Sequence, residues 1–185
     1  RDKEFKERIP TKPQFEKVNY EGADIQQPIA GLYSDIGILD IRAMYHSNID
    51  LHNICWTTLD ENGKDCGNGV KFEQGGAGLL GRQMTLMTTL RDEYKAKFRE
   101  ATTDEERSRY DSLQYATKSL VASMYGVAGD AKCAFYHPDI ASSITYTSRE
   151  TLRQLRRLCE SLGNKVIYGH TDSVFVEIAS PEEGE

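Results

Sequence analysis

The sequence predicts an α+β fold, in which an antiparallel sheet backed by helices is interrupted by an inserted antiparallel pair of helices. Two strand patterns, at residues 32–41 and 165–178, lie far apart in the 185-residue chain. Between them, apolar residues recur every three or four positions over residues 79–126, as they do along one face of a helix. A third helical stretch, residues 138–162, precedes the second strand pattern and is expected to cover the sheet.

The two strand patterns each carry an aspartate. Residues 32–41 mix apolar and β-branched side chains and reach Asp40, which predicts a buried strand with a carboxylate at its end. Residues 165–178 are apolar on both sides of Gly-His-Thr-Asp, which predicts a β-hairpin with Asp172 near its tip. Residues 1–30 are expected to form an extended lead-in, and residues 42–56 a turn into a short helix.

The helix boundaries follow from local signals. Six glycines in residues 60–78 predict a loop before the first helix. Thr103 and Glu106 have the spacing of a capping box, so a second helix is expected from about 104 to 125. Residues 133–137 are expected to be strand-like or irregular. Pro138 begins the third helix and Gly163 ends it. The predicted apolar stripes of the last two helices comprise Tyr110, Leu113, Thr117, Leu120, Val121 and Met124, then Ile140, Ile144, Leu152, Leu155 and Leu158.

The composition excludes some classes of protein. The net charge is -6, so affinity for nucleic acid would require a local cluster of basic residues. The four cysteines lack zinc-finger and C-x-x-C spacing and are expected to be reduced thiols of an intracellular protein. No apolar run of about 18 residues predicts a membrane span. Because the chain begins without Met in a charged stretch, it is interpreted as a fragment.

Asp40 and Asp172 form a candidate metal site. Neighbouring strands lie about 4.8 Å apart, so two strand-end carboxylates can converge. Phosphoryl transfer uses paired metal ions about 3.5–4 Å apart, and Mg²⁺ accepts one or two carboxylates beside phosphate and water oxygens. The backbone carbonyl of Ile41 would add a ligand. Taken singly, either aspartate is more simply a turn residue.

The helical pair carries a candidate phosphate-binding face. Arg91 and Lys95 are neighbours at i, i+4 on the first helix. Lys118 is one turn from Ala122 on the second helix, with Tyr125 beside them. If the helices are antiparallel, these rows face the same space, where three cations would suit a triphosphate. By residue type alone, a solvated helix face is the simpler interpretation.

Three segments resemble motifs of the family B DNA polymerases. Residues 40–49, DIRAMYHSNI, resemble motif A (DxxSLYPSI); residues 118–126, KSLVASMYG, resemble motif B (KxxxNSxYG); residues 168–173, YGHTDS, resemble motif C (YGDTDS). They occur in the family's order, and Arg91 and Lys95 match its R-x-x-x-K pair. The resemblance implies a palm at residues 1–75 and 128–185, holding motifs A and C, and fingers at 76–127, holding motif B.

The resemblance also implies an activity and a set of roles. The chain would be the core of a DNA-directed DNA polymerase, which transfers a deoxynucleotidyl group from a dNTP to a primer 3′-hydroxyl. Tyr45 would lie under the sugar and crowd a 2′-hydroxyl, and Tyr125 would pack near the nascent base pair. The implied metal site holds two Mg²⁺ ions, with Mn²⁺ as a substitute, on Asp40, Ile41 and Asp172, and the implied triphosphate site consists of Arg91, Lys95 and Lys118.

The implied partners are primer–template DNA, dNTP, the exonuclease and thumb domains of a longer parent chain, and a sliding clamp as a further candidate. No membrane is implied. The expected location is intracellular: cytoplasmic or nucleoid-associated, or the nucleus if the host is eukaryotic.

Four positions depart from the family pattern: Ala43, His46, Ala122 and His170 replace Ser, Pro, Asn and Asp. His170 removes a negative charge from motif C, where Thr171 and Ser173 are further candidate site residues. These departures leave open a weakened or inactive relative that binds DNA or scaffolds a replication complex. A different metal-dependent nucleotidyltransferase on a similar palm is a third hypothesis. Catalysis is favoured by the retention of Asp40, Asp172, Arg91, Lys95 and Lys118.

Overall fold

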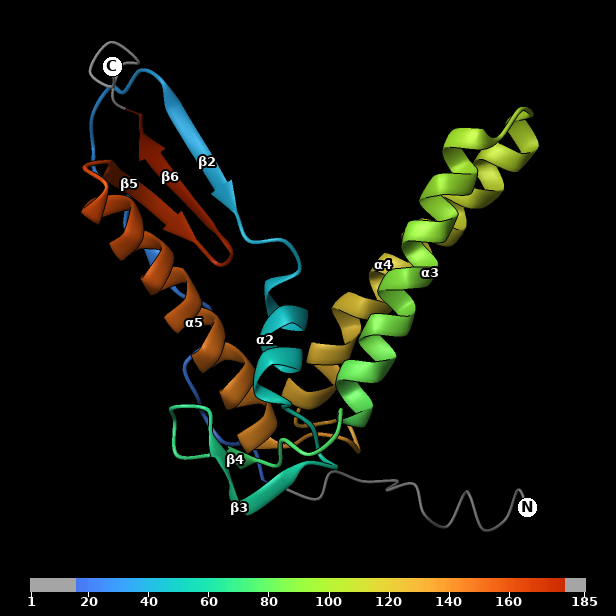
Figure 1. Cartoon of the computed structure of the whole chain (residues 1–185), viewed down its shortest axis with the longest axis horizontal. Coiled ribbons are helices and arrows are strands. Elements are labelled where there is room, and N and C mark those ends of the chain that lie inside the picture. The colour runs from blue at the N-terminus through green and yellow to red at the C-terminus, as the bar shows by residue number, and fades with distance from the viewer. Residues whose placement is uncertain (1–15, 179–185) are drawn as a thin grey trace.

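The computed structural model describes residues 16–178 and has the predicted α+β architecture. Four antiparallel strands form a sheet in the order β1 (Ile25–Gln26), β5 (Lys165–His170), β6 (Ser173–Glu177) and β2 (Ile36–Asp40). Helix α5 (Pro138–Ser161) runs along this sheet, and the paired helices α3 (Leu79–Glu100) and α4 (Asp104–Gly129) extend away from it (Figure 1). The two parts form a V whose base contains α2 (Met44–His52).

Among residues 16–178, the sheet is covered on one face only. Val174 and Val176 of β6 are buried with Leu152 and Cys159 of α5. The opposite face is open, and Ile38 of β2 is 60% exposed. The strand predicted to be buried within residues 32–41 is therefore shorter and mostly exposed, because β2 is the last strand of the sheet and has no second layer over it among residues 16–178.

The helical pair is antiparallel, as predicted. Glu106 N–H donates to Thr103 Oγ1 at 3.2 Å and Thr103 N–H donates to Glu106 Oε2 at 3.4 Å, so the capping box is confirmed. Helix α4 does not end before Gly126 but continues to Gly129. A mid-helix glycine costs only about 1 kcal/mol relative to alanine, and Ala128, which follows it, is fully buried in the main core. The last turn is thus stabilised by packing.

Residues 60–78 are not a loop throughout. They contribute to a small sheet of β3 (Leu59–Asp65) and β4 (Lys71–Phe72), which is anchored by the fully buried Phe72. The register shifts between Leu59 and Lys64, and this irregularity together with the many glycines hides the alternation expected of strands. Residues 133–137 contain turns and no strand. Two further predicted apolar positions, Leu120 and Leu158, are more than half exposed.

The main core lies at the base of the V. Side chains from α2, β4, α3, α4 and α5 meet there, and the most buried include Ile49, Phe72, Met84, Ala128 and Ile144. Helix α5 begins at Pro138 as predicted, and Gly163 follows its end with φ 82°. The four cysteines are free thiols. Within residues 16–178, no helix combines the length and apolarity that crossing a bilayer requires.

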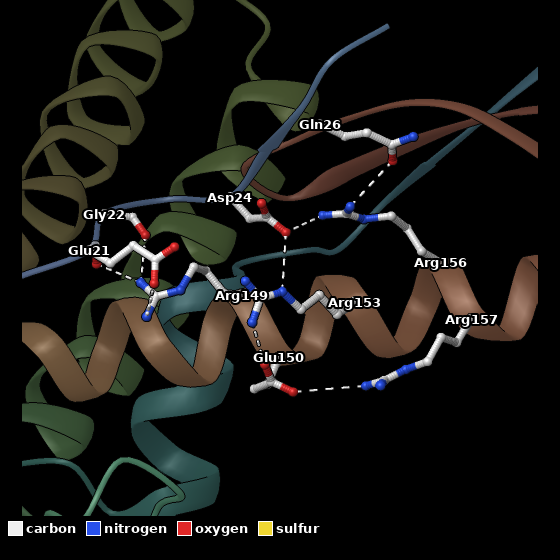
Figure 2. Close-up of polar contacts among 9 residues, drawn as sticks. All are labelled: Glu21, Gly22, Asp24, Gln26, Arg149, Glu150, Arg153, Arg156 and Arg157. Atoms are coloured by element: carbon white, nitrogen blue, oxygen red, sulfur yellow. Dashed lines mark hydrogen bonds and ion pairs between the residues drawn. The ribbon is translucent and has the colours of Figure 1, made fainter. Parts of the chain in front are cut away.

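Arginines of α5 bind the lead-in that precedes β2 through hydrogen bonds and ion pairs (Figure 2). Arg149 donates to the carbonyl oxygens of Glu21 and Gly22, and Arg156 forms an ion pair with Asp24. Residues 16–24 are irregular and β1 is only two residues long, which agrees with the extended lead-in predicted there; residues 1–15 of that prediction lie outside the described part of the chain.

Candidate functional site

Asp40 and Asp172 lie at the same edge of the sheet. Asp40 is the last residue of β2 and pairs with Ser173, the first residue of β6. The next residue, Ile41, donates its backbone N–H to the carbonyl oxygen of Asp172 at 2.8 Å. The register therefore brings Asp40, at the end of β2, next to Asp172, in the turn before β6, although they are 132 positions apart in sequence.

Asp172 belongs to the two-residue turn that joins β5 to β6, which confirms the predicted hairpin tip. Thr171 adopts a left-handed backbone conformation there, with φ 53°. Its N–H donates to the carbonyl of Asp24 at 2.9 Å, and Ser173 Oγ donates to the carbonyl of His170 at 3.3 Å. The side chains of Thr171 and Ser173 are partly buried, whereas His170 is exposed at the edge. The turn is thus held by one backbone contact, from Thr171, and one side-chain contact, from Ser173.

A cavity of about 200 Å³ joins residues from the three motif segments. Tyr45 from the start of α2, Tyr125 from α4 and Asp172 from the β5–β6 turn all line it. The rings of Tyr45 and Tyr125 are tilted at 56° with centroids 4.8 Å apart. The remaining lining residues are Ala43, Met44, His46, Met84, Val121, Ala122 and Thr171. A larger hollow of about 730 Å³ beside residues 74–78 contains none of the predicted site residues.

The two tyrosines remain neutral hydroxyls near pH 7. Burial and the carboxylate of Asp172 raise the pKa of Tyr45 above its ordinary value. Burial and a hydrogen bond with Tyr20 raise the pKa of Tyr125 further. Tyr20 lies in the lead-in and packs against the main core. Its contact with the site was not predicted, and no periodicity or motif spacing in residues 16–24 indicates it.

The three predicted cations lie along the helical pair. Met84 of α3 and Val121 of α4 line the same cavity. Because α3 and α4 are antiparallel, three residues back from Val121 along α4 correspond to three residues forward from Met84 along α3. Lys118 therefore lies at the height of Met87, and Arg91 lies one turn farther along α3. Arg91 and Lys95 are partly buried and Lys118 is exposed. The Nε of Arg91 is buried without a hydrogen-bond partner among residues 16–178.

The carboxylates suit a hard divalent cation. Within residues 16–178, the side chains of Asp40 and Asp172 make neither an ion pair nor a hydrogen bond, so their oxygens are available. No group of three or more His, Cys, Asp or Glu side chains suited to a metal exists in the same range. A two-carboxylate set matches Mg²⁺, which completes its octahedron with waters and phosphate oxygens, better than it matches Zn²⁺. The Ile41 carbonyl lies directly after Asp40 in the chain.

Comparison with known proteins gives an independent indication of the family. The family model "DNA polymerase family B" matches residues 3–184. The chain is similar to the catalytic subunit of DNA polymerase alpha from Saccharomyces cerevisiae, with 33% identity over 164 residues, which are 87% of this chain and 11% of that protein. It is likewise similar to DNA polymerase 1 of Pyrococcus abyssi, with 33% identity over 172 residues, 89% of this chain and 22% of that protein.

A solved structure shows the same fold. The family B DNA polymerase from the archaeon Pyrobaculum calidifontis superposes with a TM-score of 0.70 and 27% sequence identity, covering 95% of this chain and 24% of that one. The chain thus spans between about a tenth and a quarter of the length of these three proteins.

Proposed function

Because the chain belongs to DNA polymerase family B, we propose that it forms the catalytic core of a template-directed DNA polymerase. The reaction is transfer of a deoxynucleotidyl group from a dNTP to the 3′-hydroxyl of a primer. The observation that carries the proposal is the cavity shared by Tyr45, Tyr125 and Asp172, with Asp40 beside it. Three segments that are distant in sequence supply these residues, and each resembles one of the family's motifs.

The proposal assigns the carboxylates to metal binding. Asp40, Asp172 and the Ile41 carbonyl are the residues that would hold two Mg²⁺ ions, for which Mn²⁺ would substitute. When bound, such ions activate the attacking hydroxyl and neutralise charge on the attacking and leaving oxygens. The available carboxylate oxygens at one sheet edge support this assignment.

The remaining site residues are proposed to hold the nucleotide. Arg91, Lys95 and Lys118 bind the triphosphate, because preorganised cations stabilise the charge that develops during phosphoryl transfer. Tyr45 lies under the sugar and excludes a 2′-hydroxyl, and Tyr125 packs against the nascent base pair. Template pairing determines which base is incorporated. The unpartnered Nε of Arg91 supports a phosphate ligand at that end of the row.

In this proposal the sheet, α2 and α5 are the palm, at residues 1–75 and 128–185, and α3 and α4 are the fingers, at residues 76–127. Primer–template DNA is the partner of both. Exonuclease and thumb domains of a longer parent chain, and a sliding clamp, are further proposed partners, and the site of action is the DNA-containing compartment of the host.

The test is primer extension by the longest protein that contains this chain, with Mg²⁺. Asp40→Ala and Asp172→Ala are each expected to reduce incorporation at least 1,000-fold, on the scale of losing a main electrostatic contribution to catalysis. Asp111→Ala, on the exposed face of α4, is the matched control and should retain activity. Chelation should stop the reaction and Mn²⁺ should restore it.

The second candidate is a non-catalytic family member that binds DNA or organises a replication complex. It is favoured by Ala122 in the cavity and by His170 beside Asp172, each in place of a polar or acidic residue of the motifs. If the folded wild-type protein binds primed DNA but incorporates no nucleotide, this candidate replaces the catalytic one. Preferential incorporation of ribonucleotides would instead support the third hypothesis, a different nucleotidyltransferase.

A further inference from the structure

His46 connects α2, at the base of the V, to α3 in one of its arms. It lies in the first turns of α2, directly after Tyr45, and its side chain is only 12% exposed. The Nε2 atom lies 3.2 Å from Thr85 Oγ1, and the Nδ1 atom lies 3.4 Å from Thr88 Oγ1. Both threonines belong to α3. The imidazole therefore bridges α2, which carries site residue Tyr45, to the helix that carries Arg91 and Lys95.

Both ring nitrogens of His46 take part in the bridge. The hydroxyl of Thr88 also donates to the carbonyl of Met84 at 2.8 Å, so Thr88 Oγ1 links Nδ1 of His46 to the backbone of α3. The carboxylate of Asp50, an acceptor, lies 3.1 Å from Nε2, and Thr85 donates to the same carboxylate at 3.4 Å. Asp50 thus orients the imidazole from α2, and Thr85 and Thr88 contact its two nitrogens from α3.

The two helices also approach each other closely at this point. A Cβ atom placed on Gly81 of α3 would overlap Oδ1 of Asp50, so a larger residue there would displace the Asp50 carboxylate that faces His46. The His46 contact lies one to two turns farther along α3 from this point, at Thr85 and Thr88. Two contacts at different heights restrict rotation of α3 about its own axis more strongly than one.

The face of α3 that contacts His46 also carries the proposed triphosphate-binding residues. Thr88, Arg91 and Lys95 are spaced at i, i+3 and i+7, so their side chains lie along one stripe of the helix. Any rotation of α3 at Thr88 therefore turns Arg91 and Lys95 through the same angle. The distance from Thr88 to Lys95 along the axis is only about 10 Å.

We propose that His46 is a positioning residue that fixes the rotation of α3 through Thr85 and Thr88, and so directs Arg91 and Lys95 toward the triphosphate of the incoming nucleotide. This inference rests on the proposed function. It gives a role to a position at which this chain departs from its family's motif A, where proline stands and no side-chain hydrogen bond can form.

The test compares two adjacent threonines in the longest protein that contains this chain. Thr88→Val removes the hydroxyl that faces His46 at nearly constant volume. Thr89→Val is the matched control, because Thr89 is exposed and, among the described residues 16–178, its hydroxyl donates only within α3, to the carbonyl of Thr85. Both variants lose one intrahelical hydrogen bond, so any difference between them reports the contact with His46.

Two measurements are made on each variant. In single-turnover incorporation, Thr88→Val is expected to raise the apparent Kd for dNTP about 2- to 10-fold, the range for one hydrogen bond, with a smaller change in the maximal rate. Thr89→Val should leave both constants unchanged. In hydrogen exchange, the amides of residues 85–92 should exchange about 2- to 10-fold faster in Thr88→Val than in Thr89→Val.

A double-mutant cycle adds specificity. His46→Phe keeps an aromatic ring but removes both nitrogens, so Thr88→Val should have no further effect on dNTP affinity in that background. Equal dNTP affinities and equal exchange rates in Thr88→Val and Thr89→Val would overturn the inference, as would full additivity in the cycle. If the wild-type protein incorporates no nucleotide, the proposed function fails, and hydrogen exchange alone decides whether His46 fixes α3.

Discussion

Replacing Arg149 by methionine should destabilise the fold by about 3 kcal/mol. The Arg149 side chain is 7% exposed, and its guanidinium donates to the carbonyl oxygens of Glu21 and Gly22 at 2.5 and 2.7 Å (Figure 2). Hydrogen bonds from a charged donor are worth about 1.5–3 kcal/mol each. The lower value applies here, because Glu21 keeps a second donor, Thr145 Oγ1 at 2.8 Å, and Gly22 is exposed to water.

The ion pair between Arg149 and the Glu21 carboxylate adds little to this estimate. The Glu21 side chain is 70% exposed, and exposed pairs contribute between about 0 and 1 kcal/mol. Methionine retains most of the buried aliphatic stem, so the loss reflects the two carbonyl contacts. For a chain of this size, about 3 kcal/mol corresponds to a fall in Tm of about 6–12 °C.

Arg157→Met is the matched control on the same helix. The Arg157 side chain is 66% exposed, and its carboxylate partner in the described range, Glu150, lies 3.8 Å away. That substitution should change stability by less than about 0.5 kcal/mol. Thermal melting followed by circular dichroism, with urea unfolding as a second method, measures both. If Arg149→Met lowers Tm no more than Arg157→Met does, the carbonyl contacts do not carry the stability assigned to them.

Two further predictions concern nucleotide choice and pH. Tyr45→Ala should raise the ratio of ribonucleotide to deoxyribonucleotide incorporation at least 10-fold, because the ring proposed to crowd the 2′-hydroxyl is gone. Competing incorporation of the two nucleotides on one template measures this ratio. An unchanged ratio would contradict the assigned role of Tyr45. The pKa of His52 is lowered by burial and by the charge of Lys64. The unfolded chain therefore binds more protons than the folded chain does. Stability contributed by neutral His52 should consequently be lost as pH falls through the ordinary histidine range near 6.5. His52→Gln should therefore show a smaller fall in Tm between pH 7.5 and pH 5.5 than the wild type, and equal falls would refute the linkage.

Local signals in the sequence predicted those elements whose causes are local. The capping box of Thr103 and Glu106 needs only four consecutive residues, and the β5–β6 hairpin needs only a two-residue turn between apolar runs. Each was placed correctly because neighbouring residues contain the whole determinant. The start of α5 at Pro138 has the same character, since proline lacks the N–H that the first helical position cannot use.

Errors arose where tertiary contacts decide the outcome. Helix α4 passes Gly126 because Ala128 is buried among residues of other elements, which no helix-propensity argument includes. Strand β2 has the composition of a buried strand, yet it lies at an edge with one face open. Tyr20 meets Tyr125 only because the lead-in is held against α5. These relations depend on which elements become neighbours.

The candidate metal site depends on one such relation, the register between β2 and β6. Asp40 pairs with Ser173 and Ile38 with Phe175, which places both β2 side chains on the open face, away from α5. A slip of one residue would turn Asp40 toward the face of the sheet that carries the apolar cluster of Leu152 and Val174, where a carboxylate is unfavourable. Two further contacts favour the observed register. Ile41 packs against that apolar cluster. Gly37 leaves room for Ile178, because a Cβ atom at position 37 would lie only 2.9 Å from Cδ1 of Ile178. Apolar packing around β2 thus determines that the Asp40 carboxylate stands at the open edge beside Asp172.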